Sequence, residues 1–260
     1  MSRPAHHYRT ACATSFRRQG GFTLVELMVT VAIALFLLGG LVTIVQNVRQ
    51  ANLNQQALAQ LQDQQRFAMT VLTDQIQQAG YYADTIGETA QSALPAVGVT
   101  FKLGQAIYGT LGPPDTLTVR YQTNGGNGMI LCDGTTDPAG AGFAVHTATF
   151  TVVPPAGNVP GQLLCSVDGK AAVPLANGVT NMQVLYGVNR NAPTLNYNID
   201  TYLPADQMNA ALAAGGDWMN VTSVRVTLTF VNPLAGSPGQ QPTLNFERVI
   251  TLMGRAGVHS

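Results

Sequence analysis

The chain has 260 residues, of which only 10% are charged, and its formal net charge is zero. This length suits one ordinary domain with an appendage, or two small domains. Four of the 13 basic residues lie in the first 21 positions, which contain no acid, so the remainder carries nine basic residues against 13 acidic ones. It has no basic stripe interleaved with aromatic residues, and nucleic acid is therefore not expected as a partner.

The first element in chain order is an apolar segment behind the basic leader. From Leu27 to Val45 no residue is charged, and as a helix this run would extend about 28 Å, close to the ~30 Å core of a bilayer. Basic residues that flank a membrane helix stay on the cytoplasmic side, so the rest of the chain is expected to point outward. A cleavable signal peptide carries its small residues after the apolar core. Here Gly20 and Gly21 precede the core, so cleavage there would leave the helix on the mature protein.

Glu26 is the residue of this segment that fits a membrane least. A carboxylate at the bilayer centre costs about 2.5–3.5 kcal/mol on insertion scales, and less near a helix end. Cleavage after Gly21 would give Phe22 a free α-amine one helical turn from Glu26, on the same helical face. That amine could pair with Glu26 of its own chain or of a neighbouring subunit. The alternative is an interfacial glutamate without a partner.

The segment GGFTLVELMVTVAIALFLLGGL resembles the leader junction and N-terminal helix of type IV prepilins and type II secretion pseudopilins. The resemblance rests on Gly21 before the cut, Phe22 after it and Glu26 at the fifth mature position. It implies that a prepilin peptidase cleaves between Gly21 and Phe22 on the cytoplasmic side and methylates the new N-terminus at Phe22. It also implies that Glu26 supplies a charge used in filament assembly.

The helix is expected to continue to Ala79, because no Pro or Gly occurs between Gln46 and Gly80. Apolar residues recur there at spacings that place them on one helical face, namely Ala57, Leu61, Ala68, Leu72, Ile76 and Ala79. The other face is rich in Gln and Asn, and Gly80 suits the C-terminal cap. We expect the apolar face to pack under the domain that follows.

Beyond Tyr82, turns rich in Pro, Gly, Asn and Thr separate segments with strand-like alternation. The clearest is SVRVTLTF, with FERVITLM as its expected hairpin partner. The inward-facing positions of SVRVTLTF are Val224, Val226, Leu228 and Phe230. Four more strands are expected at TLTVRY, HTATFTVV, GQLLCSV and NMQVLYGV. Three further apolar residues are expected in the core: Met182, Leu185 and Trp218. Six or so antiparallel strands behind one long helix predict an α+β fold.

Cysteine and histidine residues are few in this chain. After the leader, which holds Cys12, only Cys132 and Cys165 remain; if the leader directs export, they are expected to form a disulfide, and the alternative is two buried thiols. Their number and spacing suit no metal site, so no metal and no cofactor are predicted. The remaining histidines, His146 and His259, have no nucleophile motif nearby, so no catalytic residue is predicted. A membrane-anchored periplasmic enzyme with a deep pocket around His146 is the alternative from a different class.

Later segments narrow the resemblance to one family. The segments LQDQQRFAMTVLTDQIQQAGYY, LANGVTNMQVLYGV, TYLPADQMNAALAAGGDWMNVTSVRVTLTF and RVITLMGRAG resemble the PilW class of minor pilins in content and order. The resemblance implies a type IV pilin-like fold. Its parts would be a leader peptide (1–21), a transmembrane and assembly half of the helix (22–46), an amphipathic half (47–82) and a β-rich periplasmic head (83–260).

The resemblance further implies a non-catalytic protein that helps to prime type IV pilus assembly and sits at or near the filament tip. It would cross the inner membrane once, with its head in the periplasm, before it joins the cell-surface pilus. The implied partners are the prepilin peptidase, the major pilin and other minor pilins, the inner-membrane assembly platform, a large tip adhesin, and membrane lipid before assembly. The alternative is a minor pseudopilin of a type II secretion system, similar to the J component, whose N-terminal helix would look the same.

Overall fold

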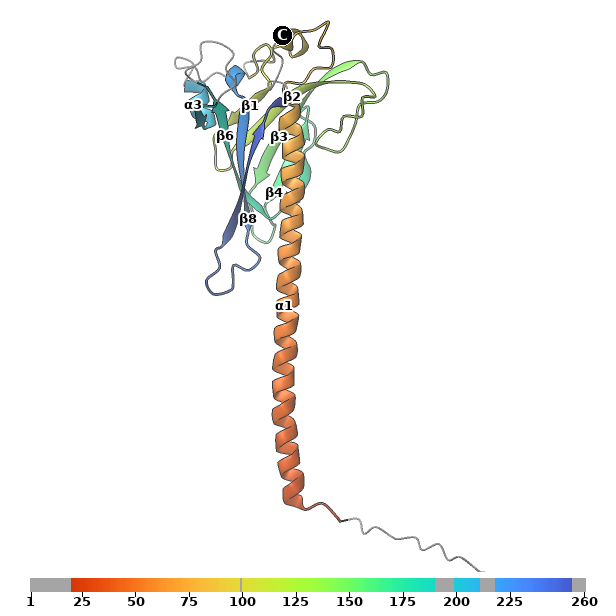
Figure 1. Ribbon diagram of the computed structural model, residues 1–260, viewed down its shortest axis with the longest axis vertical. Helices are drawn as coiled ribbons and strands as arrows, with labels where there is room; N and C mark the ends of the chain where they lie inside the picture. Colours follow the sequence, from red (N-terminus) through yellow and green to blue (C-terminus); the bar gives the residue numbers. More distant parts are fainter. Residues whose placement is uncertain (1–19, 99, 190–198, 211–217, 254–260) are drawn as a thin grey trace, which may run out of the picture. The chain divides into compact units, whose positions relative to one another are not determined.

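The computed structural model describes residues 20–98, 100–189, 199–210 and 218–253, so the leader up to residue 19 lies outside the described part. The chain divides into two compact units, Met1–Leu53 and Asn54–Ser260. Helix α1 (Leu24–Gln78) has residues in both units (Figure 1). The long helix expected from the sequence is therefore confirmed, with two residues fewer at its start and one fewer at its end.

Helix α1 ends where Gly80 follows it. Gly80 has a φ of +82°, a left-handed conformation that costs glycine little because it has no Cβ. The Gly80 amide donates a 2.8 Å hydrogen bond to the carbonyl oxygen of Arg120, which joins the end of the helix to strand β2 (Thr116–Asn124). A Cβ at Gly80 would lie 3.2 Å from the Cβ of Ala106. The expectation that Gly80 terminates the helix is confirmed.

Two antiparallel sheets make up most of the unit Asn54–Ser260 (Figure 1). The five-stranded sheet has the order β1-β2-β3-β4-β5, and the four-stranded sheet has the order β7-β6-β8-β9. The other strands are β1 Ile107–Thr110, β3 Phe143–Val153, β4 Gln162–Val167, β5 Val173–Asn177, β6 Val179–Val188, β7 Thr201–Leu203, β8 Ser223–Val231 and β9 Thr243–Thr251. The short helices are α2 Ala90–Ala93, α3 Ala205–Ala210 and the 3-10 turn η2 Trp218–Asn220. The α+β class is confirmed.

The six segments with strand-like alternation all form strands, and β8 pairs with β9 as the predicted hairpin, from Ser223↔Thr251 to Val231↔Thr243. Strands β1, β5 and β7 were not predicted. They have four, five and three residues, and so short a segment shows too little alternation to stand out from a turn.

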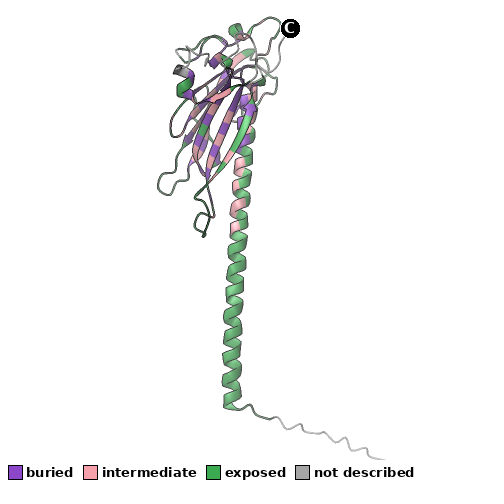
Figure 2. Ribbon diagram, turned by 60° about the vertical axis from the view of Figure 1, so that its left-hand side comes forward, coloured by how far each residue is buried: buried purple, intermediate pink, exposed green. Residues whose placement is uncertain are grey.

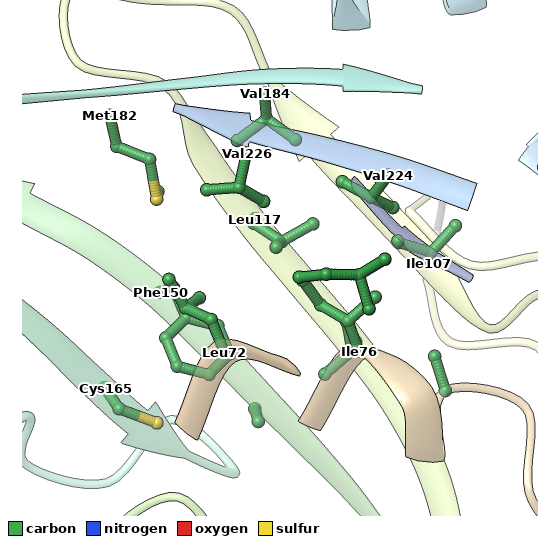
Figure 3. Packing of buried hydrophobic residues seen from close by; sticks show 14 of the residues in the cluster. Leu72, Ile76, Ile107, Leu117, Phe150, Cys165, Met182, Val184, Val224 and Val226 are labelled. Atoms are coloured by element: carbon green, nitrogen blue, oxygen red, sulfur yellow. The ribbon is translucent and has the colours of Figure 1, made fainter. Parts of the chain in front are cut away.

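One core joins both sheets to the C-terminal part of α1. Leu72 and Ile76 of α1 are fully buried, and Figure 3 shows their side chains directed into the cluster, beside residues of both sheets. Ala68 of α1 and Ala79, which directly follows the helix, are also fully buried. Burial of a Leu or Ile side chain stabilises a fold by about 1.5–3 kcal/mol, so this face of α1 anchors the helix in the head.

The core residues expected from β6 and η2 were predicted with one error. Met182 is fully buried, and Trp218 is 6% exposed with its ring 4.7 Å from that of Tyr186. Leu185 is only half-buried. The prediction was wrong because Met182 and Leu185 are three positions apart in one strand, where side chains alternate between faces, so the two residues cannot both face the core.

Candidate functional site

The predicted site residues fall into two groups. Gly21, Phe22 and Glu26 belong to the unit Met1–Leu53, and Cys132 and Cys165 belong to the unit Asn54–Ser260. In the first group, Gly21 is exposed and Phe22 is 80% exposed, and both precede the first residue of α1. Backbone outside a helix and open to solvent is what a peptidase needs around its cleavage site.

Thr23 caps the N-terminus of α1, a role that the sequence analysis missed. Its Oγ1 accepts a 3.3 Å hydrogen bond from the backbone amide of Glu26, and its carbonyl oxygen accepts one of 3.1 Å from the amide of Leu27. Thr followed three residues later by Glu is the sequence pattern of a capping box, and this pattern could have revealed the cap. The carboxylate of Glu26 lies in the first turn of α1, where the positive end of the helix dipole favours an acid.

The apolar half of α1 is uncovered. All residues from Gly20 to Leu53 are exposed (Figure 2), including large side chains such as Phe36 at 82% and Leu24 at 75%. An 18-residue window of α1 reaches a mean hydropathy of 2.6, and none of it is buried. By length and composition the helix could cross a membrane. So much apolar surface requires a cover of lipid or of other helices.

A disulfide joins Cys132, in the loop between β2 and β3, to Cys165 of β4, as the cysteine count predicts. Their Cα atoms are 6.2 Å apart, and the bridge spans 33 residues of sequence. Both cysteines are buried. The bridge therefore fixes the long β2–β3 loop to the core of the five-stranded sheet.

His146 forms a second cross-link within the head that the sequence analysis did not foresee. Its Nε2 lies 2.8 Å from Oδ2 of Asp137, in the β2–β3 loop, and its Nδ1 lies 2.8 Å from Oδ2 of Asp168, in the turn after β4. Asp137 also accepts a hydrogen bond from Thr123, and Oδ1 of Asp168 accepts one of 2.8 Å from the amide of Thr147. We call His146, Asp137 and Asp168 the histidine clamp. No sequence pattern could have revealed it, because it depends on how the β2–β3 loop folds back.

The two carboxylates determine the charge of His146. Burial lowers the pKa of the imidazole, but hydrogen bonds and charge from Asp168 and Asp137 outweigh that effect and raise the pKa above its ordinary 6.5. The hydrogen bond from Thr123 holds the pKa of Asp137 below its ordinary 3.8; burial opposes this effect, and His146 adds to it. Because both ring nitrogens of the imidazolium donate to carboxylates, neither has a lone pair with which to act as a general base. His146 thus serves a structural role in this geometry.

Two family models match the chain. The model of the prokaryotic N-terminal methylation motif matches residues 16–42, which contain Gly21, Phe22 and Glu26. The model of the type IV pilus-assembly protein W, PilW, matches residues 149–249, from β3 to β9. The chain carries a PilW domain behind a prokaryotic methylation motif. The resemblance to PilW proteins seen in the sequence is thereby confirmed.

Two pilin-like proteins of Thermus thermophilus are similar to this PilW-domain chain. The pilin-like protein PilA3 of that organism is 28% identical over 167 residues, and the match covers 64% of this chain and 66% of the length of PilA3. A solved type IV-like pilin from Thermus thermophilus matches with a TM-score of 0.37 at 14% identity, over 75% of this chain and 96% of that one. The relationship to PilA3 agrees with the PilW domain in pointing to a pilin-like protein.

Proposed function

We propose that this chain is a minor pilin that helps to prime type IV pilus assembly and takes a place at or near the filament tip. The observation that carries the proposal is an exposed apolar helix that begins within the methylation motif and continues, in the same chain, to a head that matches the PilW model. The pilin-like proteins to which the matches point are structural rather than catalytic. The match to a pilus-assembly protein favours a pilus over a type II secretion system.

Processing precedes assembly in this proposal. The basic leader remains in the cytoplasm, the prepilin peptidase cleaves between Gly21 and Phe22, and the new amine of Phe22 is methylated. The apolar half of α1 then holds the protein in the inner membrane with the head in the periplasm. The exposure of Gly21 and Phe22 outside the helix supports this order, because the peptidase acts on extended backbone.

The assembly step depends on the unfavourable free energy of the Glu26 carboxylate in lipid. A carboxylate in the apolar part of the membrane is destabilised by as much as about 2.5–3.5 kcal/mol. When α1 leaves the lipid to bundle with the helices of other pilins, the N-terminal amine of a neighbour offers Glu26 an opposite charge. Docking is therefore favoured over remaining in lipid. Because the cap of α1 uses the backbone amide of Glu26 and not its carboxylate, the side chain stays free for this pairing.

The partners follow from this role. They are the prepilin peptidase, the major pilin and other minor pilins, the inner-membrane assembly platform, and a large adhesin at the tip. Membrane lipid surrounds α1 before assembly.

Mass spectrometry of the N-terminus tests the processing step. We expect the mature chain to begin at Phe22 and to carry one methyl group there. Any other N-terminus would contradict the proposal.

Glu26→Val tests the assembly step. The variant should insert into the membrane and be cleaved, but it should fail to support piliation, because no charge remains to pair with a neighbour. Asp63→Asn is the matched control: Asp63 is an exposed acid of the same helix that pairs with Arg66 at 3.3 Å, and its loss should leave piliation unchanged. Normal piliation in Glu26→Val would refute the mechanism.

A further inference from the structure

A groove of about 1190 Å³ lies in the head alongside the C-terminal end of α1. One wall is formed by α1 from Phe67 to Gln78, a second by the 128–134 part of the β2–β3 loop, and a third by the start of β5 at Val173. We call it the head groove. All its described lining residues belong to the unit Asn54–Ser260.

The head groove is apolar along its walls and open to solvent. Three large apolar side chains of its lining are exposed: Phe67 at 54%, Ile130 at 60% and Met253 at 64%. Met129 and Met219 also line it. Flexible methionine side chains adapt their shape to a ligand, and clustered exposed apolar side chains mark contact surfaces. This lining suits the side chains of a polypeptide better than it suits water.

The charge of the head groove has one sign. Among its described lining residues the charged side chains are Asp74 and Asp133, and no Lys or Arg accompanies them. Burial works against ionisation of Asp133, but hydrogen bonds from the hydroxyl and amide of Thr135, of 2.6 and 2.9 Å, outweigh it and lower the pKa of the carboxyl. The positive charge of Lys170, which does not line the groove, adds to this effect. A ligand that brings positive charge is therefore complementary to the groove.

The wall formed by the β2–β3 loop is fixed before any ligand binds. The disulfide attaches it to β4 at Cys165, and the histidine clamp attaches it at Asp137. Nε2 of Gln75 on α1 donates a 3.1 Å hydrogen bond to the carbonyl oxygen of Ile130, while Oε1 of Gln75 accepts one of 2.8 Å from Tyr121. A preformed wall spares a ligand the entropic cost of ordering it.

We propose that the head groove docks a basic segment with apolar side chains from another pilus subunit. The inference rests on the proposed function, which supplies the class of partner. A second copy of this chain is a poor occupant, because without the leader the chain has nine basic residues against 13 acidic ones. Alternating apolar and basic side chains would place the apolar ones against Phe67 and Ile130 and the cations near Asp74 and Asp133.

A peptide-binding experiment tests the proposal. The processed full-length protein is placed in phosphatidylcholine nanodiscs, with empty nanodiscs as the blank, and fluorescence anisotropy follows three labelled ten-residue peptides. The probes alternate Leu with Lys, Leu with Glu, and Ser with Lys. We expect the Leu-Lys peptide to bind, the Leu-Glu peptide not to bind, and the Ser-Lys peptide to bind more weakly. Equal binding of the Leu-Lys and Leu-Glu peptides would overturn the proposal.

Matched variants locate the binding. Replacing both Asp74, which is exposed, and Asp133, which is half-buried, by Asn should weaken binding by about three- to tenfold, the effect of losing two ion pairs at the surface. Ile130→Ser, at an exposed position, should also weaken it. Asp206→Asn removes an exposed acid of α3 outside the groove and should change nothing. An equal loss in Asp206→Asn, or no loss in the groove variants, would overturn the proposal. A variant that ends at Met253 provides a further test. If it binds the peptide tenfold more tightly than the full-length chain, the chain's own C-terminal segment competes for the groove, and the proposal is overturned.

The same variants separate this inference from the proposed function. Ile130→Ser and the double Asn variant should lower piliation while Phe22 is still cleaved and methylated. If cells with either groove variant form pili normally while cells with Glu26→Val do not, the docking role of the head groove is refuted and the minor-pilin function stands. A different mature N-terminus would refute the function itself.

Discussion

Replacing His146 by Phe would remove the histidine clamp while keeping a flat ring of similar size in the same place. The variant loses two charge-assisted hydrogen bonds of 2.8 Å each, and bonds of this kind contribute about 1.5–3 kcal/mol apiece when buried. The side chain of His146 is 9% exposed, that of Asp137 15% and that of Asp168 31%. Solvent screens the bond to Asp168 more strongly, so we expect a loss of about 2–4 kcal/mol in the free energy of unfolding.

The pH dependence of this loss has a definite sign. The carboxylates raise the pKa of His146 above 6.5 in the folded protein. The stabilisation is therefore complete below pH 6.5 and disappears as the pH rises through the folded-state pKa. The unfolding free energy of the unmodified protein should fall as the pH rises above 6.5 and through the folded-state pKa of His146, whereas that of His146→Phe should stay flat over the same range.

Urea unfolding of the full-length protein in nanodiscs, followed through the fluorescence of Trp218, measures both effects. Trp218 is the single tryptophan and lies in the core of the head. Asp168→Asn is the companion variant: Asn tolerates the φ of +52° found at this position and still accepts hydrogen bonds, but it lacks the charge. It should move the midpoint of the pH dependence to lower pH. The reasoning is refuted if His146→Phe keeps the pH dependence of the unmodified protein, or if the midpoint in Asp168→Asn stays in place.

Three further predictions concern the stability of the head and use the same urea assay. Replacing Cys132 and Cys165 together by Ser should cost about 3.7 kcal/mol by loop entropy, given the separation of 33 residues; a loss below about 1 kcal/mol would mean that the bridge does not restrict the unfolded chain. Leu72→Ala, at a fully buried position, should cost about 2–5 kcal/mol, whereas Phe67→Ala on the exposed side of the same helix should cost far less, and equal effects would count against the described packing. Arg120→Met should lower the free energy of unfolding by several kcal/mol, on the order of 3, because the guanidinium is fully buried and donates to three backbone carbonyls. An unchanged urea midpoint would show that these hydrogen bonds do not stabilise the head.

The long helix, the strongly alternating strands and the disulfide could be predicted because each depends on local pattern or on simple counting. Val224 and Phe230 face the core because side chains alternate along β8, and Gly80 ends α1 because of its own backbone freedom. The prediction that Leu185 lies in the core was wrong because it relied on the apolar character of the residue and ignored the alternation of side chains along the strand. The Thr23 cap was visible in the sequence as a capping-box pattern and was overlooked.

The sequence by itself indicated the methylation motif and the long apolar helix, because the motif and the apolar run are contiguous and need no tertiary contact to be recognised. The spacing of Leu72 and Ile76 also predicted that this face of α1 packs in the core. Only the tertiary structure decided that Asp137 and Asp168 meet on His146. It alone decided, too, that Asp74 and Asp133 line one groove. These residues come from a helix, a long loop, a strand and a turn. Long-range packing sets the distances between such elements, so no periodicity or spacing in the sequence could predict that the residues meet.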